Sequence, residues 1–247
     1  MRIKDSTTFV AAAIVAIGVF GQMDVGVGQA QEPLDVTARL EAPRQGAKGA
    51  PRSTLNHPPA VIWLAPVDGQ PVPPLDTSRK YTLLQKNKEF TPHLLVVPVG
   101  SVVQFPNEDP FFHNVFSLFD GRRFDLGLYE AGSTREVTFA KAGVSYIFCN
   151  IHPEMSAVVI ALTTPYSAAA DSHGLFRVPA VPPGEYQLQV WVQGADAAEL
   201  KALSRRVTVS ASQTELGVIP LSRPPHPPAP HTNKYGKPYD HKESTLY

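Results

Sequence analysis

Residues 79–163 consist of short runs rich in Val, Ile, Phe and Tyr, separated by turn residues at intervals of about eight to twelve positions. β-branched and aromatic residues favour extended backbone, whereas Gly and Pro interrupt regular structure and mark turns. The whole chain has 25 prolines and 17 glycines, which argues against a helical fold. The sequence therefore predicts an all-β fold, in which about eight strands of residues 79–163 form a Greek-key β-sandwich or barrel.

A second, smaller β-sandwich unit is predicted for residues 164–222. The run 186–192 alternates apolar and polar residues, with Trp191 on the outer face. This unit has few strands of its own, but residues 34–75 contain the apolar run AVIWLAP and can supply more. Residues 79–163 are then inserted in the second unit or share one composite sandwich with it. In the alternative arrangement the two units follow each other in tandem, because linker-like segments flank residues 79–163 on both sides.

Residues 223–247 have no apolar periodicity, and the stretch 223–230 is nearly all proline. Such a composition is typical of an extended, polyproline-type or disordered segment, so we expect a Pro-rich disordered tail. The tail also carries three histidines. We interpret them as solvated residues without a ligand role: His226, His231 and His241.

The only cysteine, Cys149, ends a run of alternating apolar residues, which predicts a position at the end of a strand. His152 and Met155 follow it at spacings of three residues, and His113 lies upstream in the run PFFHNV. One thiolate and two imidazoles in a trigonal plane, with a weak axial thioether, are the ligands of a blue-copper site. The alternatives are a cysteine that packs only as a small apolar residue and a zinc site, but the soft sulfur ligands favour copper.

Two neighbours of these ligands are expected to support them. Asn114 follows His113, and its amide can both donate and accept, so we predict that it bridges to the loop that bears Cys149. Pro153 restricts the backbone of the ligand loop and has no N–H group that could donate to the sulfur.

The N-terminus has the features of a secretory signal. Arg2 and Lys4 precede the apolar run 9–20, and the small residues of 28–30 follow it. We therefore expect residues 1–30 to be a signal peptide and the protein to be periplasmic or otherwise exported; the alternative is an uncleaved anchor helix. The mature chain contains no further segment apolar enough to span a membrane. In an oxidising compartment a lone thiol pairs with another chain, stays inert in a core or takes part in chemistry.

Several of these motifs together resemble one family. The run VVQFPN at 102–107, the His113-Asn114 pair and the run GVSYIFC at 143–149 are similar to those of the cupredoxins, in the plastocyanin and amicyanin group. The short spacing between the cysteine and the methionine resembles amicyanin more than plastocyanin. The resemblance covers about a third of the chain. It implies a type 1 copper electron carrier with one copper ion per chain, held by His113, Cys149, His152 and Met155.

Residues 164–222 contain the patterns Gly-x-Phe-x-Val-Pro and Pro-Pro-Gly-x-Tyr-x-Leu. They resemble a carboxypeptidase regulatory-like β domain, which implies a sandwich without peptidase activity.

The function expected from these residues is electron transfer with a redox partner protein, such as a c-type cytochrome or a dehydrogenase. A copper enzyme would need further His-rich centres, and the chain has no His-x-His pair, so we predict that it is not an enzyme. A non-redox copper-binding or envelope-associated β scaffold remains the alternative. The formal net charge is zero, which argues against nucleic acid as a partner.

An apolar patch around His152 is the expected docking surface, because electron-transfer encounters are small and short-lived. One of the two adjacent phenylalanines is expected to be core, since neighbours on a strand face opposite ways. The residues of the expected patch are Pro110, Phe111, Phe112, Ile151, Pro153 and Met155.

Overall fold

The computed structural model describes residues 32–43, 57–67, 69–70, 72–118, 121–226 and 231–239. The expected signal peptide, residues 1–30, lies outside them. All described residues belong to one compact unit of the chain, Gln31–Tyr247. Among the described residues, no helix has the length and apolar character needed to cross a bilayer.

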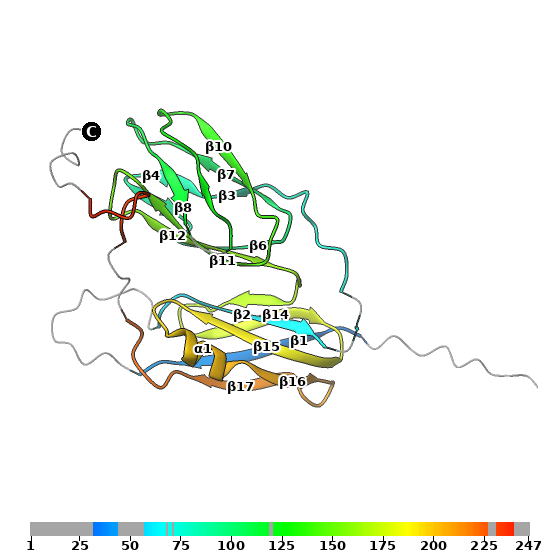
Figure 1. Cartoon of the computed structure of the whole chain (residues 1–247). Coiled ribbons are helices and arrows are strands. Elements are labelled where there is room, and N and C mark those ends of the chain that lie inside the picture. The colour runs from blue at the N-terminus through cyan, green and yellow to red at the C-terminus, as the bar shows by residue number, and fades with distance from the viewer. Residues whose placement is uncertain are drawn as a thin grey trace, which may run out of the picture. The chain divides into compact units, whose positions relative to one another are not determined.

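Ten strands between Tyr81 and Leu162 form the first domain (Figure 1). Five of them form a sheet in the order β6-β12-β11-β8-β9, three form the sheet β10-β7-β3, and β4 pairs with β5 as a hairpin. Their bounds are β3 (Tyr81–Thr82), β4 (Leu84–Lys86), β5 (Glu89–Thr91), β6 (Leu94–Pro98), β7 (Val102–Pro106), β8 (Val115–Ser117), β9 (Phe124–Asp125), β10 (Thr134–Thr138), β11 (Gly143–Cys149) and β12 (Ser156–Leu162).

Strand β11 shows how the sequence pattern positions the site. Ser145, Ile147 and Cys149 are buried and the residues between them are only partly buried, as the alternation predicts. Cys149 belongs to the same apolar core as Phe105 of β7 and Val137 of β10, so the strand end that carries the thiol is fixed by packing from the facing sheet. β11 is also paired on both sides, with β12 and β8.

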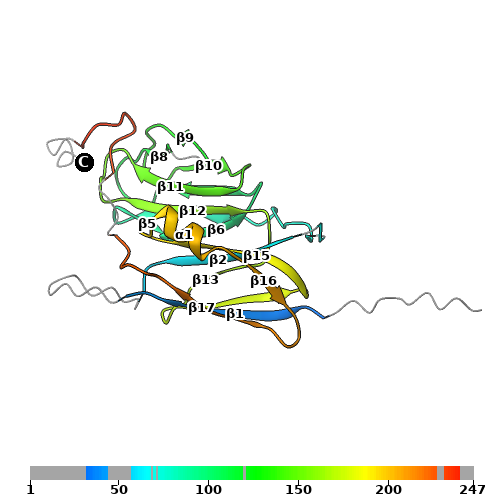
Figure 2. The same cartoon turned by 60° about the horizontal axis from the view of Figure 1, so that its bottom comes forward.

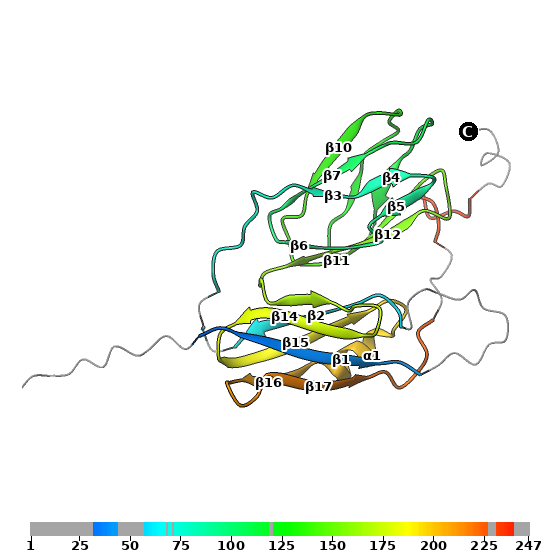
Figure 3. The same ribbon diagram turned by 180° about the vertical axis from the view of Figure 1, so that it is seen from behind.

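The second domain is built from strands at both ends of the described chain (Figure 3). Its two sheets have the orders β14-β1-β17 and β13-β2-β15-β16. Because β1 and β2 pair with strands that follow residue 162, β3–β12 are inserted between β2 and β13. The bounds are β1 (Leu34–Glu41), β2 (Ala60–Pro66), β13 (Ser167–Ala169), β14 (Leu175–Val181), β15 (Gly184–Val192), β16 (Arg205–Val209), β17 (Glu215–Pro220) and the helix α1 (Ala197–Leu203).

Two features of this domain differ from the sequence expectation. The helix α1 lies against β15 and has no fully buried residue, although Leu200 and Leu203 are partly buried against the core of this domain (Figure 2). Its seven residues are too few to establish a helical period in the sequence. Trp191, expected on an outer face, is buried in a cluster with Val61 and with Val158 and Ile160 of β12. Strand β12 is thus buried on both faces, which explains why its sequence is continuously apolar.

Candidate metal centre

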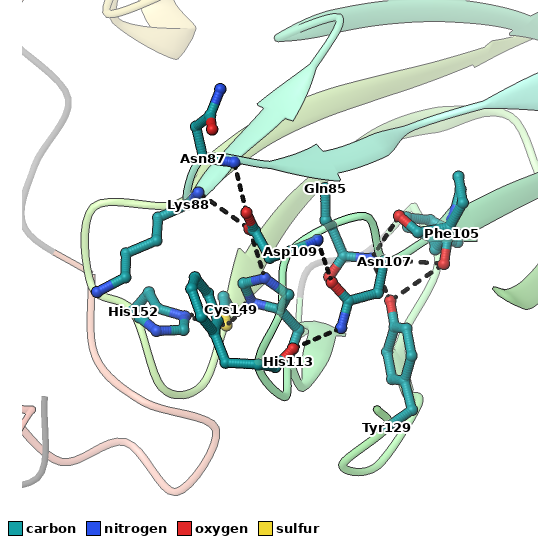
Figure 4. Close-up of polar contacts among 12 residues, drawn as sticks. Gln85, Asn87, Lys88, Phe105, Asn107, Asp109, His113, Tyr129, Cys149 and His152 are labelled. Atoms are coloured by element: carbon teal, nitrogen blue, oxygen red, sulfur yellow. Dashed lines mark hydrogen bonds and ion pairs between the residues drawn. The ribbon is translucent and has the colours of Figure 1, made fainter. Parts of the chain in front are cut away.

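Three side chains, one from a strand end and two from loops, meet in the first domain (Figure 4). Cys149 ends β11, His152 lies on the loop that follows, and His113 lies just before β8. The Cys149 Sγ atom is 3.5 Å from His113 Nδ1 and 3.6 Å from His152 Nδ1, and the two Nδ1 atoms are 3.2 Å apart. All three residues are buried.

These distances can be tested against the size of a metal ion. The point equidistant from the three atoms lies about 2.0 Å from each, close to the bond lengths of about 2.0–2.3 Å that nitrogen and thiolate make to a divalent ion such as zinc. The donor set of two imidazoles and one thiolate is the one that type 1 copper binds in a trigonal plane. The residues therefore fit the expected ion.

The electrostatics of the site also favour a metal. Burial lowers the pKa of His152 to about 4, with a further contribution from the neighbouring His113, and burial also lowers the pKa of His113. Both imidazoles are neutral at pH 7, so their lone pairs are available to an ion. Burial raises the pKa of the Cys149 thiol, against backbone N–H groups of Asn114, Ile151 and His152 that stabilise the thiolate. A bound cation would favour the thiolate further, because metal binding displaces the thiol proton.

Met155 is fully buried on the same loop. The backbone N–H of Cys149 donates to the Met155 carbonyl at 3.3 Å, and the N–H of Met155 donates to the His152 carbonyl at 3.1 Å. Pro153 lies in the turn between these residues and is partly buried. These bonds close the loop and hold Met155 beside the ligands, while its role as the axial ligand stays a prediction.

Asp109, which the sequence reasoning missed, supports His113. Its buried carboxylate accepts a hydrogen bond from His113 Nε2 at 2.9 Å and from the backbone N–H groups of Asn87 and Lys88 at 2.6 and 3.0 Å (Figure 4). Burial by itself would raise the pKa of Asp109, but the hydrogen bonds from Lys88, His113 and Asn87 lower it overall. The charged carboxylate keeps the proton of His113 on Nε2 and leaves Nδ1 free to bind an ion.

The position of Asp109 depends on an unusual turn. Asn87 and Lys88 connect β4 and β5 and both have positive φ, 57° and 59°, which is the conformation of a type I′ hairpin turn. This turn directs two successive N–H groups to the carboxylate. The only sequence signal was an acidic residue four positions before His113, and in a loop that spacing has no geometric meaning.

The structure corrects the role expected for Asn114. Its side-chain amide donates to Asp125 of β9 at 2.6 Å instead of reaching the loop that bears Cys149. The connection to that loop is made by the backbone, because the carbonyl of Asn114 accepts the N–H of Asn150 at 2.8 Å.

The surroundings of His152 also differ from the expected docking surface. His152 is only 1% exposed, and the ring of Phe111 contacts both imidazoles at a steep inclination, with centroid distances of 5.3 Å to His152 and 5.4 Å to His113. Phe112 is 41% exposed and Phe111 is partly buried, so neither phenylalanine is fully in the core. Of the remaining expected patch residues, Pro110 is exposed, Ile151 and Pro153 are partly buried, and Met155 is buried.

Comparisons with known proteins give partial similarities. Solved structures that match include a copper-containing nitrite reductase from Thermus scotoductus SA-01 (26% identity, TM-score 0.33), a purple cupredoxin from Nitrosopumilus maritimus (25%, 0.30) and an amicyanin mutant in the Cu(I) state (21%, 0.31). Each match covers 34% of this chain, and the shares of the other chains are 22%, 98% and 82%. The chain thus spans about a fifth of the nitrite reductase. No curated protein matches.

The strand arrangement of β3–β12 and their buried His-Cys-His set agree with the cupredoxin-like fold that the sequence motifs predicted. Residues 161–216 match a family model described as polysaccharide lyase family 4, domain II. This match lies mainly in the second β domain. This model covers less than half of the chain, and it describes a β unit of the kind that the resemblance to regulatory-like domains predicted.

Proposed function

We propose that this chain is an exported type 1 copper protein that carries electrons, with His113, Cys149, His152 and Met155 as the copper ligands. The observation that supports this most directly is the buried triangle of two Nδ1 atoms and one Sγ atom with sides of 3.2–3.6 Å. Its size fits one ion, and both imidazoles are neutral at pH 7.

Bound copper supplies a one-electron couple between Cu(I) and Cu(II), which thiolate, thioether and imidazole ligands tolerate in both states. The protein residues hold the geometry constant during that exchange. Cys149 is fixed by the pairing of β11, and His113 is held by the charged Asp109 on one side and by backbone pairing with Tyr129 on the other. Burial of all the ligands excludes water, so little has to rearrange when an electron is gained or lost.

The partner in this proposal is another redox protein, such as a c-type cytochrome or a dehydrogenase. It docks on the surface formed by Pro110, Phe111, Phe112, Ile151 and Pro153, and electrons pass through Phe111 to the covered His152. The contact of Phe111 with both imidazoles supports this route. A modest apolar surface suits short-lived electron-transfer encounters.

The proposed role is electron transfer without catalysis. The alternative is a copper-binding or envelope-associated scaffold that undergoes no redox turnover, and the separate second domain supports it, since β1, β2 and β13–β17 take no part in the site. A reversible Cu(I)/Cu(II) couple with rapid electron exchange would distinguish the carrier from the scaffold.

The test of the proposal is the visible spectrum of the protein loaded with Cu(II). We expect one copper ion per chain and an intense thiolate-to-copper absorption band. Cys149→Ser should abolish the band entirely, because no thiolate remains to donate charge to the ion. Wild-type protein that stays colourless and free of copper after loading would refute the proposal.

A further inference from the structure

A segment of the expected tail, residues 231–239, packs on the strand end that carries Cys149, which the sequence reasoning did not anticipate (red in Figure 1). The Tyr239 hydroxyl donates to the Cys149 carbonyl at 2.7 Å, and the Lys234 backbone N–H donates to Asn150 Oδ1 at 2.9 Å. The His231 ring stacks on Phe148, with centroids 4.0 Å apart and planes inclined by 25°. We call residues 231–239 the strap.

The strap has an internal structure that presents these groups together. Asn233 Oδ1 accepts the N–H groups of Tyr235 and Lys237, and the Asn233 carbonyl accepts the N–H of Gly236. His231 Nδ1 lies 3.1 Å from the Tyr239 hydroxyl, whose own proton is donated to Cys149, so His231 donates to the hydroxyl oxygen. The two ends of the strap are thereby tied to each other where they meet Cys149 and Phe148.

A charged contact connects the strap to the loop of the other histidine. Lys234 Nζ is 2.7 Å from Asp125 Oδ2, and Asp125 Oδ1 accepts the side-chain amide of Asn114 at 2.6 Å. The Lys234 side chain is only 19% exposed, so water screens this ion pair less than a fully exposed one. Asn114 directly follows His113, which places a hydrogen-bonded chain between the strap and the second ligand loop.

The strap holds the backbone that carries the N–H groups which stabilise the Cys149 thiolate. The backbone N–H groups of Asn114, Ile151 and His152 favour the thiolate form, since they lower the pKa of Cys149 against the effect of burial. The strap binds Cys149 and Asn150, which precede two of these donors, and through Asp125 it fixes Asn114, which is the third. The direction of each N–H depends on the backbone that these contacts hold in place.

We propose that the strap is a positioning element of the copper site, with Tyr239 as its main contact, and that it sets the hydrogen bonding of the Cys149 thiolate. This inference rests on the proposed copper site. Hydrogen bonds to the sulfur withdraw charge from it and favour Cu(I), which raises the reduction potential. Loosening of the strap should therefore lower the potential without removing the copper ligands.

The test compares Tyr239→Phe with Tyr235→Phe in the full-length protein. Tyr239→Phe removes the hydroxyl that donates to Cys149 and retains the ring. Tyr235 belongs to the same strap but is 72% exposed, so its variant is a matched control. The readouts are the reduction potential and the position of the thiolate-to-copper band in the loaded protein, together with the rate at which a thiol reagent labels Cys149 in the metal-free protein.

We expect Tyr239→Phe to keep one copper ion per chain. Relative to wild type and Tyr235→Phe, its thiolate-to-copper band should shift and its reduction potential should be lower. In the metal-free variant, the thiol reagent should label Cys149 several-fold faster. The proposal is wrong if Tyr239→Phe and Tyr235→Phe have the same reduction potential and the same band position. If only the labelling of Cys149 becomes faster, the strap shields the thiol from solvent but does not position the copper site. Equal labelling of the metal-free variants would also overturn the proposal. A wild-type protein that binds no copper would refute the proposed function instead, while the labelling comparison would still decide whether the strap holds Cys149.

Discussion

Asp109→Asn tests the support of the site by a buried charge. The carboxylate accepts three hydrogen bonds, from His113 Nε2 and from the N–H groups of Asn87 and Lys88. An amide has one oxygen and one NH2 group, so at least one of the three donors would lose its acceptor and face another donor. The lost charge-assisted hydrogen bond is worth about 1.5–3 kcal/mol and an unsatisfied buried donor costs about 1–3 kcal/mol.

These losses bear on copper binding through the orientation of His113. Loss of a carboxylate that orients a metal-binding histidine typically weakens metal affinity by about 10- to 100-fold, or about 1.4–2.7 kcal/mol. We expect Asp109→Asn to weaken copper affinity within this range and to destabilise the metal-free protein as well. Competition titration with a chelator measures the affinity, and urea denaturation of the metal-free protein measures the stability.

Glu108→Gln is the matched control, because Glu108 is the adjacent carboxylate and forms an exposed ion pair with Lys86, with about half of each side chain accessible. Such surface pairs contribute about 0–1 kcal/mol, so this variant should bind copper like the wild type. Copper affinities that are equal in Asp109→Asn and Glu108→Gln would refute the argument that the charge of Asp109 holds His113.

Three further predictions follow from the geometry of the site. Met155→Gln should keep copper and colour but lower the potential measured by redox titration, and complete loss of the metal would mean that Met155 is more than a weak ligand. Pro153→Glu should slow electron exchange with a small cytochrome and leave the spectrum intact; Pro179→Glu, at an exposed proline of the second domain, is the control, and equal rates in both would show that electrons leave elsewhere. The metal-free protein should lose stability as pH falls from about 6.5 towards 4. The pKa of His152 is lowered from 6.5 to about 4 in the folded state, so the unfolded chain takes up the proton first over this interval. Urea unfolding midpoints that do not change between these pH values would contradict this prediction.

The sequence alone predicted most of the strands and the three residues whose Nδ1 and Sγ atoms form the triangle of the metal centre. Alternation with a period of two marks each strand locally, and β11 buries the face that ends in Cys149 as its sequence predicts. His152 follows Cys149 on a short loop, so the chain itself keeps the two ligands close together. His113 was predicted because a blue-copper site needs a second imidazole and because the His113-Asn114 pair resembles that of the cupredoxins.

Whether residues 34–75 complete the second sandwich was left open by the sequence and is decided by pairing between distant segments. β1 pairs with β14 and β17, and β2 pairs with β13 and β15. Strand-forming patterns record which face of a strand is buried but carry no information about its neighbours in the sheet.

The supports of the site depended entirely on the tertiary structure. Asp109 reaches His113 because a hairpin turn at residues 87–88 gives its carboxylate two further donors, and Tyr239 reaches the carbonyl of Cys149 across ninety positions of the chain. Asn114 donates to Asp125, although its position beside His113 suggested a bridge to the ligand loop. Hydrogen bonds of this kind join groups that only folding brings together, so a linear pattern of residue types can identify the metal ligands but not the residues that hold them in place.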